Sequence, residues 1–142
     1  VFIKKINLKN FRLTFRSKYR AADIERKKNS IVPGGLFEIS KTDEKKLDIY
    51  EDYPILYTKY YFYYYGKKVM TYTMVKKTIF RFPTERYLNI IKKGYQDCKL
   101  EKKYLNKALK NKWFYHLTKY LYFIIAIKAS KPSIKEIFFP SL

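Results

Sequence analysis

The sequence predicts a single α+β domain in which most strands precede the helices. With 142 residues, the chain is long enough to bury one hydrophobic core without disulfides or metals. Its hydrophobic content of 47% is typical of a folded chain rather than of a disordered polycation. Alternation of apolar and polar residues prevails before residue 75 and helical spacing after residue 84, with no repeat or low-complexity linker between them.

Two strands are expected near the start of the chain. Phe11, Leu13 and Phe15 alternate with polar residues, which predicts a half-buried strand, and residues 21–25 predict a weaker one. In the segment IVPGGLFEIS, residues 33–35 predict a turn. A further strand follows this turn, and its glycines permit close backbone approach.

Six of the 12 acidic residues lie between positions 38 and 52, on or beside a predicted helix. Ser40 followed by Asp43 is a capping-box pattern and predicts a helix over residues 41–50. Asp43 suits the positive N-terminal end of this helix, and Asp48 suits its exposed face. Glu51 and its neighbour at position 52 fall at the C-terminal end, where the helix dipole disfavours negative charge. Their placement calls for another explanation.

An aromatic hairpin and two helices are expected in the rest of the domain. Residues 56–65 and 69–75 are predicted strands joined by a turn at Gly66-Lys67, with aromatic side chains covering both faces. Thr84 opens one helix, and a second runs from Glu101 to about Asn111. The apolar faces consist of Tyr87, Ile90, Ile91 and Tyr95 in the first helix and Tyr104, Leu105, Ala108 and Leu109 in the second.

The segment 113–127 is strongly hydrophobic. It is shorter than the ~20 apolar residues that a membrane-spanning helix needs, and Lys119 interrupts it. We therefore expect it to pack on the domain or on a partner subunit, which is compatible with a homodimer, and we predict no transmembrane segment.

The composition restricts the function classes. The formal net charge of +20 suggests nucleic-acid binding, but only six of the 32 cations are Arg, the residue that sequence-specific readers favour. No nucleic-acid-binding motif occurs, so we predict no specific nucleic-acid partner. Cys98 is the single cysteine and His116 the single histidine, which excludes an internal disulfide and a structural zinc site of the usual kind. We expect a cytoplasmic protein with no metal and no cofactor.

Four fragments, PGGLFEIS, LDIYEDYPILY, MTYTM and PTERYLNIIKKGYQDCKLEKKYL, occur in this order. Together they resemble the gamma-glutamylcyclotransferase-like family over residues 10–108. The resemblance implies a compact mixed β-barrel-like sheet flanked by helices. It also implies a domain at residues 1–110 and a hydrophobic C-terminal extension at residues 111–142.

The resemblance also implies a reaction and a site. In that family the Glu of a Leu-Asp-x-x-Glu motif is the catalytic acid/base, and Glu51 occupies this position. The implied reaction converts a γ-glutamyl amine or peptide, the expected small-molecule partner, to 5-oxoproline and a free amine. Tyr57, Tyr72 and Tyr87 match tyrosines around the family's substrate pocket. For each tyrosine, core packing with a hydroxyl hydrogen bond is an equal alternative.

Two departures from the family pattern leave other functions open. No Tyr-Gly-Ser-Asn loop precedes the domain, so we expect it to be N-terminally incomplete. Asp52 stands where many relatives have Gly, and an extra carboxylate beside Glu51 would raise the cost of ionising both. The alternatives are a non-catalytic relative that binds a small molecule or protein and, third, a basic nucleic-acid binder.

Overall fold

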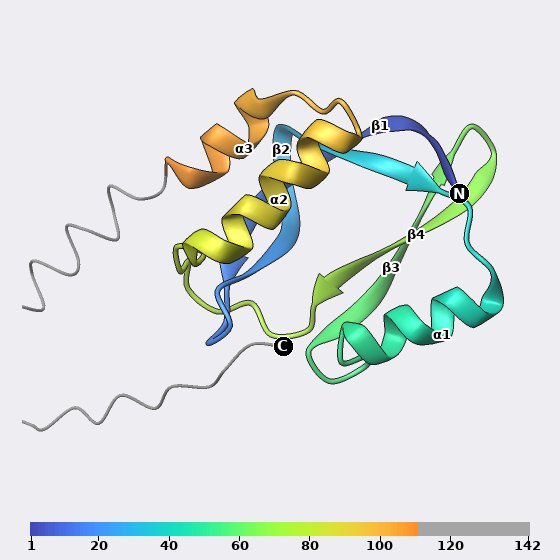
Figure 1. Cartoon of the computed structure of the whole chain (residues 1–142), viewed down its shortest axis with the longest axis horizontal. Coiled ribbons are helices and arrows are strands. Elements are labelled where there is room, and N and C mark those ends of the chain that lie inside the picture. The colour runs from blue at the N-terminus through green and yellow to red at the C-terminus, as the bar shows by residue number, and fades with distance from the viewer. Residues whose placement is uncertain (111–142) are drawn as a thin grey trace, which may run out of the picture.

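The computed structural model describes residues 1–110, which form two antiparallel sheets and three helices (Figure 1). The predicted α+β class is confirmed. The predictions for residues 111–142 lie outside the described residues. In chain order the elements are β1 (Phe2–Arg16), β2 (Ala21–Phe37), α1 (Lys41–Tyr50), β3 (Tyr57–Tyr64), β4 (Lys67–Met74), α2 (Glu85–Asp97) and α3 (Lys102–Leu109).

The β1–β2 hairpin is longer than the sequence predicts. The expected turn at residues 33–35 is wrong, because Pro33 and the two glycines lie inside β2, where Pro33 is opposite Asn7. The chain turns earlier, between Ser17 (φ 68°) and Arg20 (φ 56°). Proline is tolerated in an edge strand, and in a two-stranded sheet both strands are edges.

The glycines of this segment have different roles. A Cβ atom at Gly35 would lie 2.7 Å from the ring of Phe37 and 2.9 Å from Sγ of Cys98, at the end of α2. Gly34 has no atom within 4 Å of such a Cβ. Gly35 therefore makes room for side chains rather than for the close backbone approach that the sequence predicts.

The aromatic hairpin forms as predicted, but its turn lies one residue earlier than the expected Gly66-Lys67, because Lys67 already pairs with Tyr64. β3 and β4 pair from Tyr57 opposite Met74 to Tyr64 opposite Lys67. The two turn residues, Tyr65 (φ 47°) and Gly66 (φ 73°), both adopt left-handed backbone conformations, which matches a two-residue turn of the type I′ kind.

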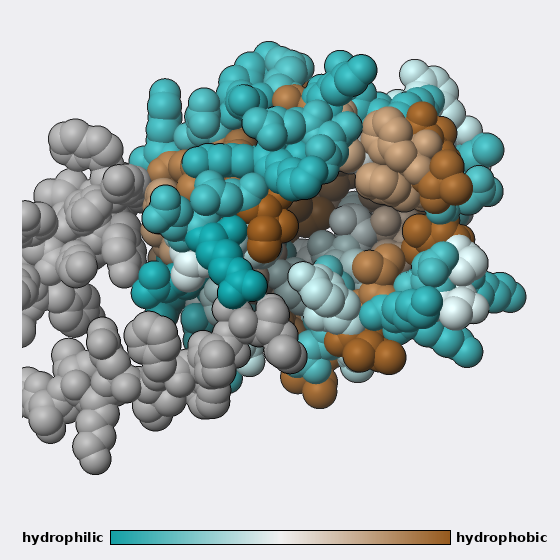
Figure 2. Space-filling view, in the orientation of Figure 1, coloured by the Kyte–Doolittle hydropathy of each residue, from teal (hydrophilic) through white to brown (hydrophobic). Residues whose placement is uncertain are grey.

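The two sheets do not join into one barrel-like sheet, so this part of the expectation is wrong. A recess of about 480 Å³ separates the widely spaced parts of the two hairpins (Figure 2). Apolar side chains line it, including Leu8, Val32, Phe62 and Val69. Where β2 and β4 do approach, the groups that connect them are side chains, as described below.

The main core lies where α2 and α3 cover the β1–β2 sheet (Figure 1). Its buried members are Phe15, Leu88, Tyr95, Leu105 and Ala108. The apolar stripe expected on α3 is confirmed. The expected apolar face of α2 is only partly correct, because it left out Leu88, which is buried, and included Ile90, which is 62% exposed. Helix α1 lies beside the other sheet and contributes no buried residue, although its capping box of Ser40 and Asp43 forms as predicted.

Candidate active site

Glu51 lies immediately after α1, where it caps the helix C-terminus. Its N–H donates to the carbonyl of Leu47 at 2.8 Å. The residue is half-buried, and this desolvation raises the pKa of the Glu51 carboxyl. No ion pair joins Glu51 to a cation of residues 1–110. In so basic a chain, an unpaired, partly desolvated carboxylate is unusual.

The structure brings Glu51 and the three tyrosines singled out from the sequence to one place. Glu51, Tyr57, Tyr72 and Tyr87 all line a hollow of about 240 Å³. They come from the end of α1, from β3, from β4 and from α2, respectively. Three other hollows of residues 1–110 are larger, two at about 480 Å³ each and one at about 300 Å³.

Each tyrosine hydroxyl is anchored inside the protein. The Tyr57 hydroxyl donates to the carbonyl of Ala22 at 2.5 Å, and the Tyr87 hydroxyl accepts from the N–H of Ala22 at 3.1 Å. The Tyr72 hydroxyl donates to Oδ1 of Asp48 at 2.5 Å. These contacts fix the walls of the hollow against β2 and α1, and they fit the packing role that the sequence left open for each tyrosine.

The tyrosines are neutral at physiological pH. Desolvation is the main cause that raises the pKa values of Tyr57, Tyr72 and Tyr87 above the usual range of a phenol. The charge of Glu51 contributes to the raised pKa of Tyr57 and of Tyr87, which reflects its proximity to both. Among these four groups, Glu51 is therefore the candidate for proton transfer.

Asp52 does not act on Glu51 as expected. Desolvation alone raises the pKa of Glu51, with no contribution from its neighbour. Asp52 is exposed and has a left-handed backbone (φ 49°), a conformation that glycine adopts most easily. A backbone requirement thus explains why Gly suits this position, and Asp tolerates the same conformation better than most residues.

Asp48 is not on an exposed face of α1, which corrects the prediction. Besides Tyr72, its carboxylate accepts from Nζ of Lys59 at 2.8 Å, and the same ammonium donates to Glu44 at 2.6 Å. These bonds lower the pKa of Asp48. They also tie α1 to β3 and so position Glu51 at the helix end.

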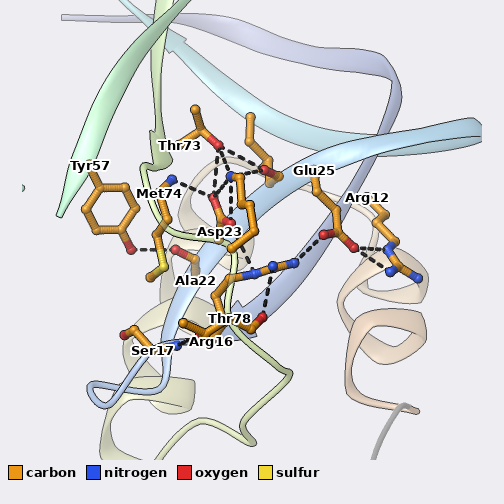
Figure 3. A network of polar contacts seen from close by, with 12 residues as sticks. Arg12, Arg16, Ser17, Ala22, Asp23, Glu25, Tyr57, Thr73, Met74 and Thr78 are labelled. Atoms are coloured by element: carbon orange, nitrogen blue, oxygen red, sulfur yellow. Dashed lines mark hydrogen bonds and ion pairs between the residues drawn. The ribbon is translucent and has the colours of Figure 1, made fainter.

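Sequence reasoning missed Asp23, a buried carboxylate that lines the same hollow. Figure 3 shows its polar contacts. Its Oδ1 accepts from the N–H of Met74 at 2.8 Å and from the hydroxyl of Thr73 at 3.0 Å. Lys77 Nζ lies 2.9 Å from Oδ2, and Arg16 Nε lies 3.2 Å from the same oxygen, without hydrogen-bond geometry. Aspartate is disfavoured in strands, so an Asp within a predicted strand was the sequence signal that could have pointed to this residue.

The buried Arg16 extends this network. Its guanidinium pairs with Glu25, which also pairs with Arg12, and it donates to the carbonyl of Thr78 at 3.0 Å. The hydrogen bonds to Arg12 and Arg16 lower the pKa of Glu25, although its partial burial acts in the opposite direction. The network therefore connects β1, β2 and the segment after β4 (Figure 3). Asp23 is its member that lines the Glu51 hollow. Within residues 1–110, no three His, Cys, Asp or Glu side chains gather as a metal site would require.

The comparisons with known proteins concern the fold. No protein-family model and no curated protein matches the sequence. A solved structure entitled "Gamma-glutamyl cyclotransferase" matches with a TM-score of 0.57 and 21% identity, over 75% of this chain and 72% of that chain. The chain has the gamma-glutamyl cyclotransferase fold. An uncharacterized protein from Homo sapiens matches with a TM-score of 0.59 and 22% identity, with the same coverages.

The resemblance to gamma-glutamyl cyclotransferases that the ordered fragments indicate is thus confirmed at the level of the fold. Within residues 1–110, no helix is both long and apolar enough to cross a lipid bilayer. The cytoplasmic setting and the domain boundary at residue 110 stay predictions.

Proposed function

We propose that the protein is a gamma-glutamylcyclotransferase-like enzyme with Glu51 as its general acid/base. The observation that carries this proposal is the Glu51 carboxyl itself. It has a raised pKa and no cationic partner in residues 1–110, and it lines a hollow with three neutral tyrosines in a gamma-glutamyl cyclotransferase fold.

The proposed reaction needs one proton-transfer group. Ionised Glu51 takes a proton from the α-ammonium of a γ-glutamyl amide, and the freed amine attacks the γ-carbonyl carbon of the same molecule. A new C–N bond closes the five-membered ring, and the bond to the leaving nitrogen breaks. Glu51 returns the proton to that nitrogen, so the products are 5-oxoproline and a free amine. Nucleophile and electrophile share one molecule, which supplies proximity without a cofactor.

The raised pKa of Glu51 suits both halves of this cycle. A carboxylate that has lost part of its hydration is a stronger base than an exposed one, and its protonated form remains available to the leaving amine. The tyrosines have another role. Tyr57 and Tyr87, held by the backbone of Ala22, shape the hollow and limit the access of water to Glu51.

The test is the release of 5-oxoproline from a panel of γ-glutamyl amides and dipeptides by the full-length protein. Glu51→Gln is nearly isosteric and should lower kcat by about two orders of magnitude or more, because it removes the general acid/base. Asp52→Asn, at the exposed neighbouring acid, is the matched control and should keep wild-type turnover. Equal turnover by wild type and Glu51→Gln would refute the assignment. Binding of a γ-glutamyl ligand without any turnover would favour the non-catalytic alternative.

A further inference from the structure

A second hollow, of about 480 Å³, lies between the β1 strand and the far end of the β3–β4 hairpin. Its lining includes Lys5, Asn7 and Lys9 from β1 and Tyr63, Tyr64 and Tyr65 from the end of β3 and its turn. It also includes one acidic residue, Glu101, whose carboxylate is paired with Lys103. It shares no lining residue with the Glu51 hollow. The proposed cyclisation uses none of these groups.

Aromatic rings are exposed around this hollow. Tyr63 is 76% exposed and Tyr65 is 85% exposed. The ammonium of Lys4 lies 5.0 Å from the ring centroids of both Tyr64 and Tyr65. Tyrosine rings are normally partly buried in the protein. Exposed tyrosine rings beside ammonium groups therefore form a surface that suits a planar, anionic partner.

The two lysines that line the hollow, Lys5 and Lys9, are not neutralised by ion pairs within the described part of the chain. No ion pair joins Lys5 or Lys9 to an acid of residues 1–110. Most acidic side chains of residues 1–110 are already engaged in ion pairs. Those in ion pairs with a lysine or arginine are Asp23, Glu25, Glu44, Asp48, Asp97 and Glu101.

We propose that this hollow binds single-stranded nucleic acid without sequence preference, with bases stacked on Tyr63 and Tyr65 and phosphates on Lys5 and Lys9. Open aromatic rings beside lysines provide the two contacts that such binding needs, stacking for the bases and charge for the backbone. A duplex keeps its bases stacked on each other and unavailable to the rings. A lipid surface would need a projecting apolar patch, whereas these rings border a hollow with an Asn and lysines.

This partner agrees with the composition. Sequence-specific reading favours Arg forks on base edges, and the chain is poor in Arg. Lysine binds phosphate as a point charge, and every base presents a π-face, so neither contact needs a particular sequence. The prediction against a specific nucleic-acid partner therefore does not conflict with the proposal.

The test is fluorescence anisotropy of a labelled single-stranded oligothymidylate with the full-length protein at several salt concentrations. Tyr63→Ala should weaken binding about 5- to 150-fold, the equivalent of one lost stacking contact. Lys5→Gln and Lys9→Gln should each weaken binding and lower the slope of log affinity against log salt by ~0.7. Tyr63→Phe keeps the ring and should keep the affinity.

Matched controls exist elsewhere on the chain. Tyr19 is 57% exposed and has the ammonium of Lys18 5.0 Å from its ring centroid, but it lies at the β1–β2 turn, outside the hollow. Tyr19→Ala and Lys92→Gln, on the exposed side of α2, should leave the affinity within about twofold of wild type.

Three results would overturn the proposal. One is an equal loss of affinity in Tyr63→Ala and Tyr19→Ala. Another is equal affinity for the oligothymidylate and for a polyphosphate of the same charge, which would show a plain polycation. The third is binding to phosphatidylserine vesicles without binding to the oligonucleotide.

Discussion

The Glu51 carboxylate loses part of its hydration and gains no cation of residues 1–110 in return, although the chain carries 32 lysines and arginines. Such an arrangement costs folding free energy, because the charged form is less well solvated in the folded state than in the unfolded chain. A residue placed for stability alone would pair with a lysine, as Asp48 and Glu44 do with Lys59. This cost is typical of functional sites.

Removal of the Glu51 charge should therefore stabilise the protein at neutral pH. The folded-state pKa of Glu51 is raised above the ordinary value of 4.5. At low pH the carboxyl is protonated in both the folded and the unfolded state, so it does not change the unfolding free energy there. As pH rises through the folded-state pKa, ionisation destabilises the folded wild type, and Glu51→Gln escapes this loss. The midpoint of thermal unfolding, followed by circular dichroism, should be higher for Glu51→Gln at pH 7. The two proteins should converge below pH 4, and a lower midpoint for Glu51→Gln at pH 7 would contradict the raised pKa.

The local elements were predictable from sequence because their signals are local. Ser40 and Asp43 fix the start of α1 by two reciprocal hydrogen bonds, and the predicted bounds of this helix agree with the structure. The alternating aromatic segment around Gly66 likewise predicts the β3–β4 hairpin, although the turn falls at Tyr65-Gly66 rather than at Gly66-Lys67.

The features that sequence reasoning missed depend on partners far along the chain. Pro33 is tolerated because β2 is an edge strand, which no local pattern reveals. Asp23 is buried because Lys77 and Thr73, about fifty positions away, supply its hydrogen bonds. The expected barrel failed for a related reason, since these side chains connect β2 to β4 where a continuous sheet would use backbone hydrogen bonds.

Asp23 should therefore stabilise the contact between the two sheets. Asp23→Asn keeps the size of the side chain but leaves the buried Arg16 with one carboxylate fewer, which should cost about 3 kcal/mol of unfolding free energy. Asp97→Asn breaks the exposed pair with Lys93 and should cost less than about 1 kcal/mol. Urea denaturation measures both. A loss from Asp23→Asn no greater than the loss from Asp97→Asn would show that the network does not hold the sheets together.

At the scale of the whole molecule, the two proposed sites occupy different ends of the β3–β4 hairpin. Tyr57 and Tyr72 belong to the Glu51 hollow, near the start of β3 and the end of β4, whereas Tyr63 and Tyr65 lie at the turn end. A small hollow with a proton-transfer group and a larger basic, aromatic one can therefore operate on separate ligands.

The two sites should respond independently to mutation. Tyr63→Ala should leave the rate of 5-oxoproline release within about twofold of wild type, and Glu51→Gln should leave oligothymidylate affinity within the same limit, because distant sites without shared partners are additive. Parallel loss of both activities in either variant would mean that the substitution disturbs the fold rather than one site. Urea denaturation of each variant is the control.

The central claim is that the Glu51 carboxyl is a partly desolvated proton-transfer group, and its titration tests this most directly. Carbon-13 NMR of the side-chain carboxyls in the full-length protein follows each Glu through the pH range, and Glu51→Gln identifies the Glu51 resonance by its disappearance. We predict a midpoint above the ordinary 4.5, matched by the acidic limb of kcat/KM for 5-oxoproline release. A midpoint at or below 4.5 would contradict the claim, since it would show a carboxylate that is solvated or paired with a cation.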